Sequence, residues 1–213
     1  MKVKIYCLSL LLGILIMTGC TRFFDSSGYV AAMTDALYKG DYGAYAQFTG
    51  ISTAEVSQYR DQWLSNTADN FITIMGSGNP SDEMRSRITD LLKKIYANAK
   101  YEITNEENGD VQMTIWPIDL ITRNCDTLQA YVTDFNTKND TFAFSSMSEE
   151  EFYDTYLEGI ITILESHLAE LSYQEPVQLN ISICRDENGL YTIDSKTLAG
   201  IQENILQWPD AEY

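Results

Sequence analysis

The sequence predicts an α+β fold for residues 28–213, in which N-terminal helices are followed by a four-stranded antiparallel sheet with helices packed on one face. Apolar residues recur at helical spacing as far as Ile95, and at Tyr101 the spacing changes to every second residue, which is typical of a strand. The order of helices and then a hairpin occurs again after Pro117. Two αα-ββ units are therefore an alternative description of the same single domain.

The N-terminus has the layout of a secretory signal peptide. Lys2 and Lys4 precede an apolar run of 13 residues, from Ile5 to Met17. This run is shorter than the roughly 20 residues that a membrane-spanning helix needs. A basic start, a short apolar segment and then small residues predict a leader over residues 1–19 that is removed from the mature protein.

The end of this leader, Met17-Thr18-Gly19-Cys20, resembles the lipobox of bacterial lipoproteins, although Met17 stands where that family more often has leucine. The resemblance implies acyl groups on Cys20, with cleavage just before it. Two acyl chains hold a protein stably on a bilayer. We therefore expect residues 20–27 to be a lipidated cysteine and tether on the outer face of the cell membrane. The alternatives are an ordinary secretory signal and an uncleaved anchor.

The charge of the chain excludes several partners. It has 14 basic and 31 acidic residues, and loss of Lys2 and Lys4 with the leader lowers the formal net charge from -17 to -19. Nucleic acids and anionic lipids attract basic surfaces, so neither is an expected partner. The membrane is expected to hold the domain through the lipid at Cys20.

Two cysteines, Cys125 and Cys184, remain in the expected domain. They would close a long loop if they formed a disulfide, but sequence spacing does not show whether their Cα atoms approach each other. Two buried free thiols are the preferred interpretation. Together with one distant histidine they lack the close spacing of a metal site, and no cofactor is expected.

Each element before the first hairpin has a local signal. Val30, Met33 and Leu37 predict a helix over residues 28–39, with Gly40 as its stop. A short helical piece follows in residues 41–48. Residues 52–75 and 81–95 form two longer helices, the first opened by a Ser-x-x-Glu capping box and the second by a capping serine followed by two acidic residues.

The second half of the chain alternates strands and helices. Strands at residues 101–103 and 111–115 flank an Asn-Gly turn in "NEENGD", and strands at 177–183 and 190–194 flank "RDENG". Neither acidic turn has the ligand ladder of a calcium loop. Helices are expected over residues 119–135, 148–171 and 196–207, with a polar loop at 136–146.

Three stretches, "YVAAMTDALYKGDYGAYAQFTGIS", "AKYEI" with the later "WPID", and "DENGLYTID", resemble an uncharacterised group of Gram-positive bacterial lipoproteins. The resemblance covers most of the mature chain and implies surface anchoring without a particular activity. More loosely, helices followed by a sheet that ends in "GLYTID" are similar to the NTF2-like and cystatin-like folds. The two helices expected between the hairpins depart from that pattern.

Two sets of residues are candidates for function. The uncovered sheet face would carry side chains that alternate away from the core: Gln112, Thr114, Trp116, Gln178, Asn180 and Ser182. Such a face could line a groove or simply meet solvent. The only histidine, His167, falls on an apolar helical stripe, so we expect a core or core-edge position, with a general base in a pocket as the alternative.

From these observations we expect a non-enzymatic, lipid-anchored extracytoplasmic domain. It would bind a partner protein, an envelope component or a small ligand through the sheet face. The alternative is an NTF2-like enzyme or small-molecule pocket that uses His167.

Overall fold

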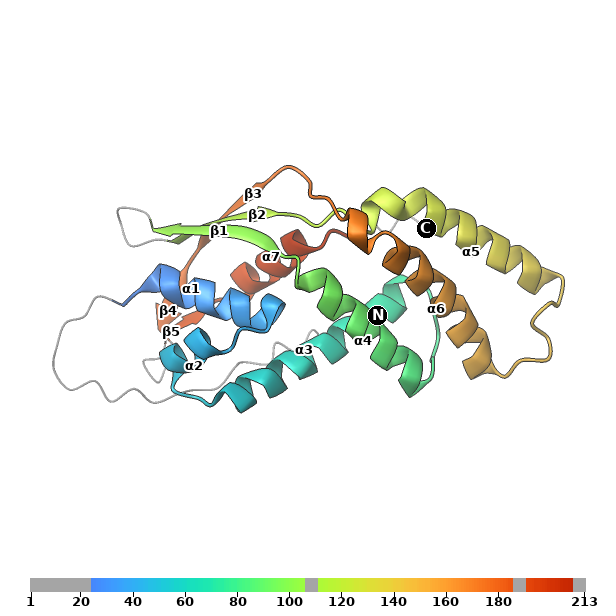
Figure 1. Ribbon diagram of the computed structural model, residues 1–213, viewed down its shortest axis with the longest axis horizontal. Coiled ribbons are helices and arrows are strands. Elements are labelled where there is room, and N and C mark those ends of the chain that lie inside the picture. The colour runs from blue at the N-terminus through green and yellow to red at the C-terminus, as the bar shows by residue number, and fades with distance from the viewer. Residues whose placement is uncertain (1–23, 106–110, 186–190, 209–213) are drawn as a thin grey trace.

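The computed structural model describes residues 24–105, 111–185 and 191–208, which form helices around two small antiparallel sheets (Figure 1). The α+β class is confirmed. The helices are α1 (Ser26–Thr34), α2 (Gly43–Thr49), α3 (Thr53–Ile74), α4 (Asp82–Tyr96), α5 (Cys125–Asp140), α6 (Glu149–Ser166) and α7 (Ser195–Ile205). Their buried side chains belong to one hydrophobic core.

The first helix begins earlier than the sequence predicts. Asp25 caps α1 by accepting a hydrogen bond from the Gly28 amide at 2.9 Å. The helix continues as a π-helical turn, η1 (Asp35–Lys39), and ends at Gly40, whose φ of 75° favours glycine. Residues 24–27, which were predicted to lie in the tether, are therefore part of the fold.

Helices α3 and α4 agree closely with the prediction. The capping box between Ser52 and Glu55 opens α3, and Ser81 caps α4. The predicted apolar stripe of α4 is buried in full: Met84, Ile88, Leu91, Leu92 and Ile95. Local capping signals and helical periodicity were sufficient to define this part of the chain.

The prediction of a four-stranded sheet was wrong. Strands β1 (Lys100–Asn105), β2 (Val111–Trp116) and β3 (Val177–Ile181) form one antiparallel sheet with β2 in the centre. Strands β4 (Ile183–Arg185) and β5 (Tyr191–Ile193) form another. Ile181 already lies opposite Val111, the first residue of β2, so the chain beyond Ile181 has no partner left in β2 and pairs with β5 instead. The alternative description as two equivalent αα-ββ units is also wrong, because β3 pairs with the first hairpin.

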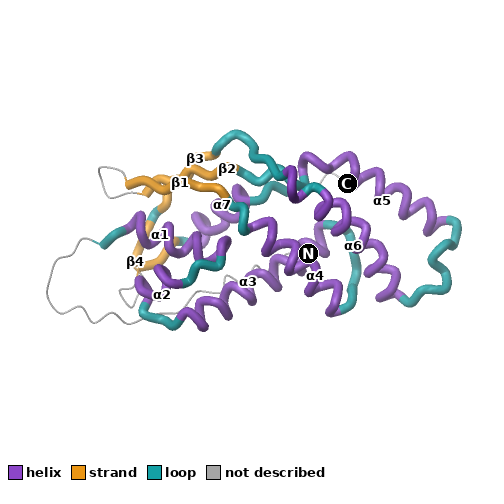
Figure 2. The backbone as a smooth tube through the Cα atoms, viewed as in Figure 1, coloured by secondary structure: helices purple, strands orange, loops and turns teal. Residues whose placement is uncertain are grey.

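The three-stranded sheet has one covered face. Val111, Met113 and Ile115 of β2 are buried, and helices α1 and α7 pack against the sheet on this side. Figure 2 shows both helices on the same side of the three strands. The turns at residues 106–110 and 186–190 lie outside the described residues.

Helices α5 and α6 form a hairpin at the end of the molecule opposite α1 (Figure 1). The chain enters α5 through a 3-10 turn, η2 (Thr122–Asn124), so the α-helix starts later than the predicted Asp119. It also runs past Phe135 to Asp140, into the segment predicted as a loop, where an ion pair of 2.7 Å between Lys138 and Asp134 supports the last turns. Helix α6 is shorter than predicted and is followed by a 3-10 turn, η3 (Leu168–Glu170).

Candidate functional site

An open cavity of about 320 Å³ lies between the end of α3 and the α5–α6 hairpin. Its walls are mainly apolar and aromatic, with a few polar groups, which is the usual composition of a small-molecule or peptide site. The lining residues are Ile74, Met75, Gly76, Ile121, Cys125, Leu128, Gln129, Val132, Phe135, Asn136, Phe152, Tyr153, Tyr156 and Ile160.

Helical periodicity places the α5 wall. Leu128, Val132 and Phe135 recur at spacings of four and three residues, so their side chains lie on one face of α5. Gln129 and Asn136 flank this stripe and are exposed, which places amide groups where the cavity meets solvent. The apolar stripe was predicted, but as a packed core surface.

Aromatic rings form the part of the wall nearest the tip of the hairpin. The ring centroid of Phe135 lies 4.5 Å from that of Phe144 in a stacked arrangement and 5.2 Å from that of Phe152, edge to face. The ring centroid of Tyr156 lies 5.1 Å from that of Phe135, also edge to face. Such pairs add about 1 kcal/mol each beyond the burial of their area. The wall is therefore rigid on the side of α6.

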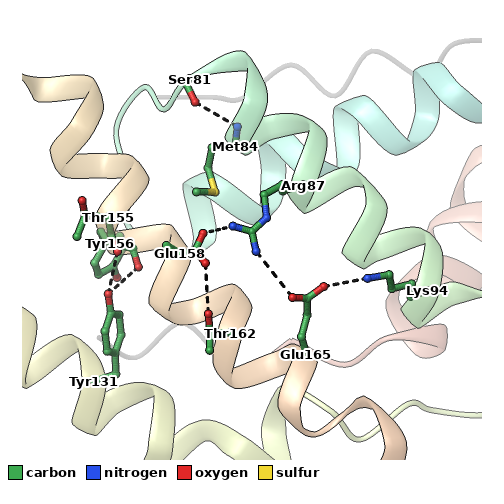
Figure 3. A network of polar contacts seen from close by, with 10 residues as sticks. All are labelled: Ser81, Met84, Arg87, Lys94, Tyr131, Thr155, Tyr156, Glu158, Thr162 and Glu165. Atoms are coloured by element: carbon green, nitrogen blue, oxygen red, sulfur yellow. Dashed lines mark hydrogen bonds and ion pairs between the residues drawn. The ribbon is translucent and has the colours of Figure 1, made fainter.

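Tyr131 sets the distance between α5 and α6. Its hydroxyl donates hydrogen bonds to the carbonyl oxygens of Tyr156, at 2.9 Å, and Thr155, at 3.2 Å (Figure 3). Its ring fills the space beside Gly159, where no Cβ could be accommodated without movement. Burial, followed by the nearby Tyr156, raises the pKa of the Tyr131 hydroxyl to about 12, so it remains a donor at neutral pH.

Polar contacts fix α6 on its other neighbour, α4. Arg87 of α4 contacts the carboxylate of Glu158 and lies 3.8 Å from that of Glu165, which also pairs with Lys94 at 2.9 Å (Figure 3). These side chains are between about one third and three fifths exposed, so each pair contributes at most about 1 kcal/mol. Their main effect is to fix the position of α6 between α4 and α5.

The end of α3 completes the cavity. The Tyr156 hydroxyl donates a hydrogen bond of 2.6 Å to the carbonyl oxygen of Met75, directly after α3. The chain then turns at Gly76, whose φ of 70° favours glycine. Tyr156 therefore belongs to the wall and also joins α6 to the end of α3.

The structure brings together most of the predicted sheet-face residues. Gln112 lies opposite Asn180, and Thr114 lies opposite Gln178, so these four form two cross-strand pairs. Gln178 and Asn180 are exposed, and Gln112 and Thr114 are half-buried. Ser182 lies between β3 and β4 and is not part of the three-stranded sheet.

Trp116, also predicted for this face, already has a cation against its ring. The Lys100 ammonium lies 4.6 Å from the Trp116 ring centroid and 5.5 Å from that of Tyr173. A ligand that stacked on Trp116 would have to compete with this cation–π contact. The apolar cavity is not lined by these face residues.

His167 is half-buried, so of the two expected positions, core and core edge, it has the second. It forms the C-cap of α6, and its side chain is 39% exposed. Its Nδ1 lies 3.8 Å from the Glu170 carboxylate, and it does not line the apolar cavity. Because α6 ends at Ser166, the apolar stripe does not continue through His167 as an uninterrupted helix would require.

Cys125 and Cys184 are free thiols, half-buried and exposed respectively. The expectation that both are buried was wrong for Cys184. Cys20 lies outside the described residues. Within the described residues, no group of three metal-binding side chains is present, and none of the helices combines the length and apolar character needed to cross a membrane.

Comparison with known proteins yields one informative likeness. No protein-family model matches the chain, and no curated protein matches it. Among solved structures, it is similar to YcdA of Bacillus subtilis, provisionally classed as a lipoprotein, with a TM-score of 0.60 and 18% sequence identity. The match covers 86% of this chain and 56% of that one, so this chain spans little more than half the length of YcdA.

At this identity the likeness is one of fold. It supports the expected similarity to an uncharacterised lipoprotein group, whereas the looser NTF2-like resemblance is not shown.

The sequence did not predict the cavity itself. An apolar stripe on a helix looks the same whether another element covers it or leaves it open. The nearest signal was "TFAFSSM", where apolar residues occur in a segment that was otherwise read as a polar loop.

Proposed function

We propose that this protein is a lipid-anchored domain on the outer face of the cell membrane that binds an apolar or amphipathic ligand between α3, α5 and α6. The observation that carries the proposal is the open cavity of about 320 Å³, which falls within the size range of ligand sites. No chemical step is assigned to it, because His167, the candidate base, lies outside its wall.

The position of the cavity fits a domain that receives its ligand from the side away from the membrane. Phe24, four residues after the proposed lipid at Cys20, packs near Phe48 at the end of α2, with ring centroids 6.3 Å apart. Helix α3 starts soon afterwards, and its 22 residues span about 33 Å before Ile74 reaches the cavity. The site is thus well separated from the point of anchoring.

The two cysteines allow a direct test of binding. In the lipidated protein held in nanodiscs, alkylation of Cys125 by iodoacetamide is followed by peptide mass spectrometry, with Cys184 as the internal reference. We expect 1-naphthol, an uncharged apolar probe, to slow alkylation of Cys125 several-fold and to leave Cys184 unchanged. Equal rates at Cys125 with and without saturating probe would contradict the proposal.

A cavity-filling variant gives the matched control. Val132→Trp places a large side chain in the space, so Cys125 should be alkylated slowly even without the probe. Val132→Ile adds one methylene and should retain the probe effect. The anchor is tested separately by metabolic labelling with a fatty acid, which should mark the wild type and not the Cys20→Ala variant.

The uncovered sheet face is a second candidate site, favoured by the cross-strand alignment of Gln112 with Asn180 and of Thr114 with Gln178. It would bind a partner protein or an envelope component. In cross-linked envelope extracts, Trp116→Ala should abolish retention of a partner that the wild type captures, whereas Val132→Trp should not. Unchanged capture by Trp116→Ala would count against this site.

A further inference from the structure

We infer that the cavity between α3, α5 and α6 accepts the apolar face of a cationic amphipathic helix. This inference rests on the proposed function and specifies the chemistry of its ligand. It combines three independent features of the α5–α6 hairpin, namely the length of its apolar strip, its charge and an exposed phenylalanine at its tip.

The apolar strip is longer than a compact small molecule requires. Its α5 side extends from Cys125 to Asn136, which corresponds to about 16 Å along the helix axis. A helix bound in a groove places side chains at i, i+4 and i+7, which cover about 10 Å. The strip therefore matches two to three turns of a bound helix.

The hairpin is strongly acidic. Residues 125–166 carry nine acidic and one basic side chain, a formal charge of -8. Two of these acids, Glu158 and Glu165, pair with Arg87 and Lys94 of α4, so the hairpin together with these two cations still has a formal charge of -6. The one basic residue, Lys138, pairs with Asp134 at 2.7 Å. The nearby Arg123 guanidinium donates to the Glu170 carbonyl oxygen at 3.0 Å. This distribution favours a cationic ligand over a neutral or anionic one.

Acidic side chains also flank the apolar strip itself. Asp140 lies four residues beyond Asn136 on the same face of α5, and Glu149 lies three residues before Phe152 on α6. Asp126 stands at the opposite end, next to Cys125. All three acids are exposed. A bound helix with lysine or arginine beside its apolar face would meet carboxylates at both ends of the site.

Phe142 is an exposed apolar residue at the tip of the hairpin. Its side chain is 78% exposed, and it is the one non-glycine residue with positive φ in the described part of the chain, at 62°. Glycine or asparagine would fit this turn at lower cost, and a bulky residue in this conformation is uncommon. Phe142 lies two residues before Phe144, whose ring stacks on that of Phe135, and an exposed aromatic ring is typical of a contact residue for a partner.

A synthetic helix tests the inference. The probe is a fluorescent peptide of about 14 residues with leucine at i, i+4, i+7 and i+11 and lysine at most other positions. Binding to the lipidated protein in zwitterionic nanodiscs is measured by anisotropy, with empty nanodiscs subtracted. We expect saturable binding that weakens with salt. A scrambled peptide of the same composition, and one with glutamate in place of lysine, should bind at least about tenfold more weakly.

Two variants with matched controls locate the site. Phe142→Gly should weaken binding about tenfold while leaving stability unchanged or improved, because the strained φ is relieved. Neutralising Asp126, Asp140 and Glu149 together should weaken binding by roughly tenfold at low salt. Neutralising Asp41, Asp61 and Glu203, three exposed acids outside the hairpin, should leave affinity unchanged.

The outcomes separate this inference from the proposed function. If 1-naphthol protects Cys125 but the cationic peptide binds no better than its glutamate counterpart, the cavity is a ligand site and the inference is wrong. If neither probe acts, both fail. Dimerisation that depends on Phe142 and excludes the peptide would also overturn it, because the occupant would then be a second copy.

Discussion

The ring of Tyr131 on α5 occupies the space that glycine leaves at position 159 on α6, and its hydroxyl bonds to the Tyr156 carbonyl oxygen on the same helix. A ring placed against a glycine lets two helices approach closely, while the hydrogen bond fixes their relative position. This pair therefore sets the width of the cavity between α5 and α6.

Gly159→Ala should destabilise the protein by about 2 kcal/mol, because the added methyl group overlaps the Tyr131 ring in a packed interface. The free energy of unfolding is measured by chemical denaturation. In a Tyr131→Ala background the same change should cost almost nothing, so the double-mutant cycle should show a coupling of about 2 kcal/mol.

Gly200→Ala in α7 is the matched control for this prediction. A Cβ at this position meets no atom within 4 Å, so the substitution should stabilise the helix by about 0.5–1 kcal/mol. Equal effects at positions 159 and 200 would show that the Tyr131 contact does not determine the spacing of the hairpin.

Features that depend on neighbouring residues could be predicted from the sequence, whereas features that depend on distant segments could not. A capping pair such as Ser52 with Glu55 acts over three residues, and this one was predicted correctly. Strand pairing depends on register between distant segments. The alternation through residues 177–183 continues past Ile181, but where the strand changes partner depends on where β2 begins, at Val111.

The candidate site shows the same limit. Periodicity identified the apolar face of α5, and alternation identified the polar partners Gln112 and Asn180. Neither pattern shows which faces remain open, because that depends on how α3, α5 and α6 pack. His167 lies at the edge of the core and not inside it, because a position on a helical wheel has meaning only while the helix continues, and α6 ends one residue before it.

The Tyr38 hydroxyl is buried without a hydrogen-bond partner among the described residues. Its ring packs against Trp63 and Tyr96, with centroids 5.6 and 5.5 Å away. Burial raises the pKa of this hydroxyl well above its usual value. An unsatisfied buried donor costs free energy, so Tyr38→Phe should raise the free energy of unfolding by about 1 kcal/mol.

Tyr156→Phe is the comparison, because it removes the same group from a tyrosine whose hydroxyl donates to Met75 at 2.6 Å. Here the loss should destabilise the protein by about 1 kcal/mol. The two substitutions should therefore have opposite signs in the same denaturation experiment. A destabilised Tyr38→Phe variant would mean that the hydroxyl has a partner.

The capping box of α6 predicts a pH dependence. Hydrogen bonds from the Ser148 amide, and then from its hydroxyl, lower the pKa of the Glu151 carboxyl below its ordinary value of 4.5. Since the pKa is lower in the folded chain, this contribution to stability is present in full above pH 4.5. It is lost as the pH falls through the folded-state pKa.

The test compares melting temperatures between pH 6 and pH 3. Glutamine keeps the hydrogen bonds of the box but does not titrate, so Glu151→Gln should lose less stability on acidification than the wild type. Glu203→Gln removes an exposed acid that caps no helix and should follow the wild-type curve. If the melting temperatures of Glu151→Gln and the wild type fell equally with pH, the capping box would not be the source of this pH dependence.

Phe24 should stabilise the fold although it lies only four residues after Cys20. Its ring stacks on that of Tyr191 in β5, with centroids 3.5 Å apart and planes within 8°, and it contacts Tyr29 at 5.5 Å. Loss of this stack and of the buried area predicts that Phe24→Ala destabilises the protein by about 1–2 kcal/mol. Hydrogen exchange should accelerate first in β5 and α1.

Phe142→Ala supplies the control, since it makes the same change at a ring that is 78% exposed, and its stability should be close to that of the wild type. If Phe24→Ala behaved in the same way, residues 24–27 would act as part of a flexible tether. A destabilised variant instead means that the folded domain begins at Phe24, four residues after Cys20.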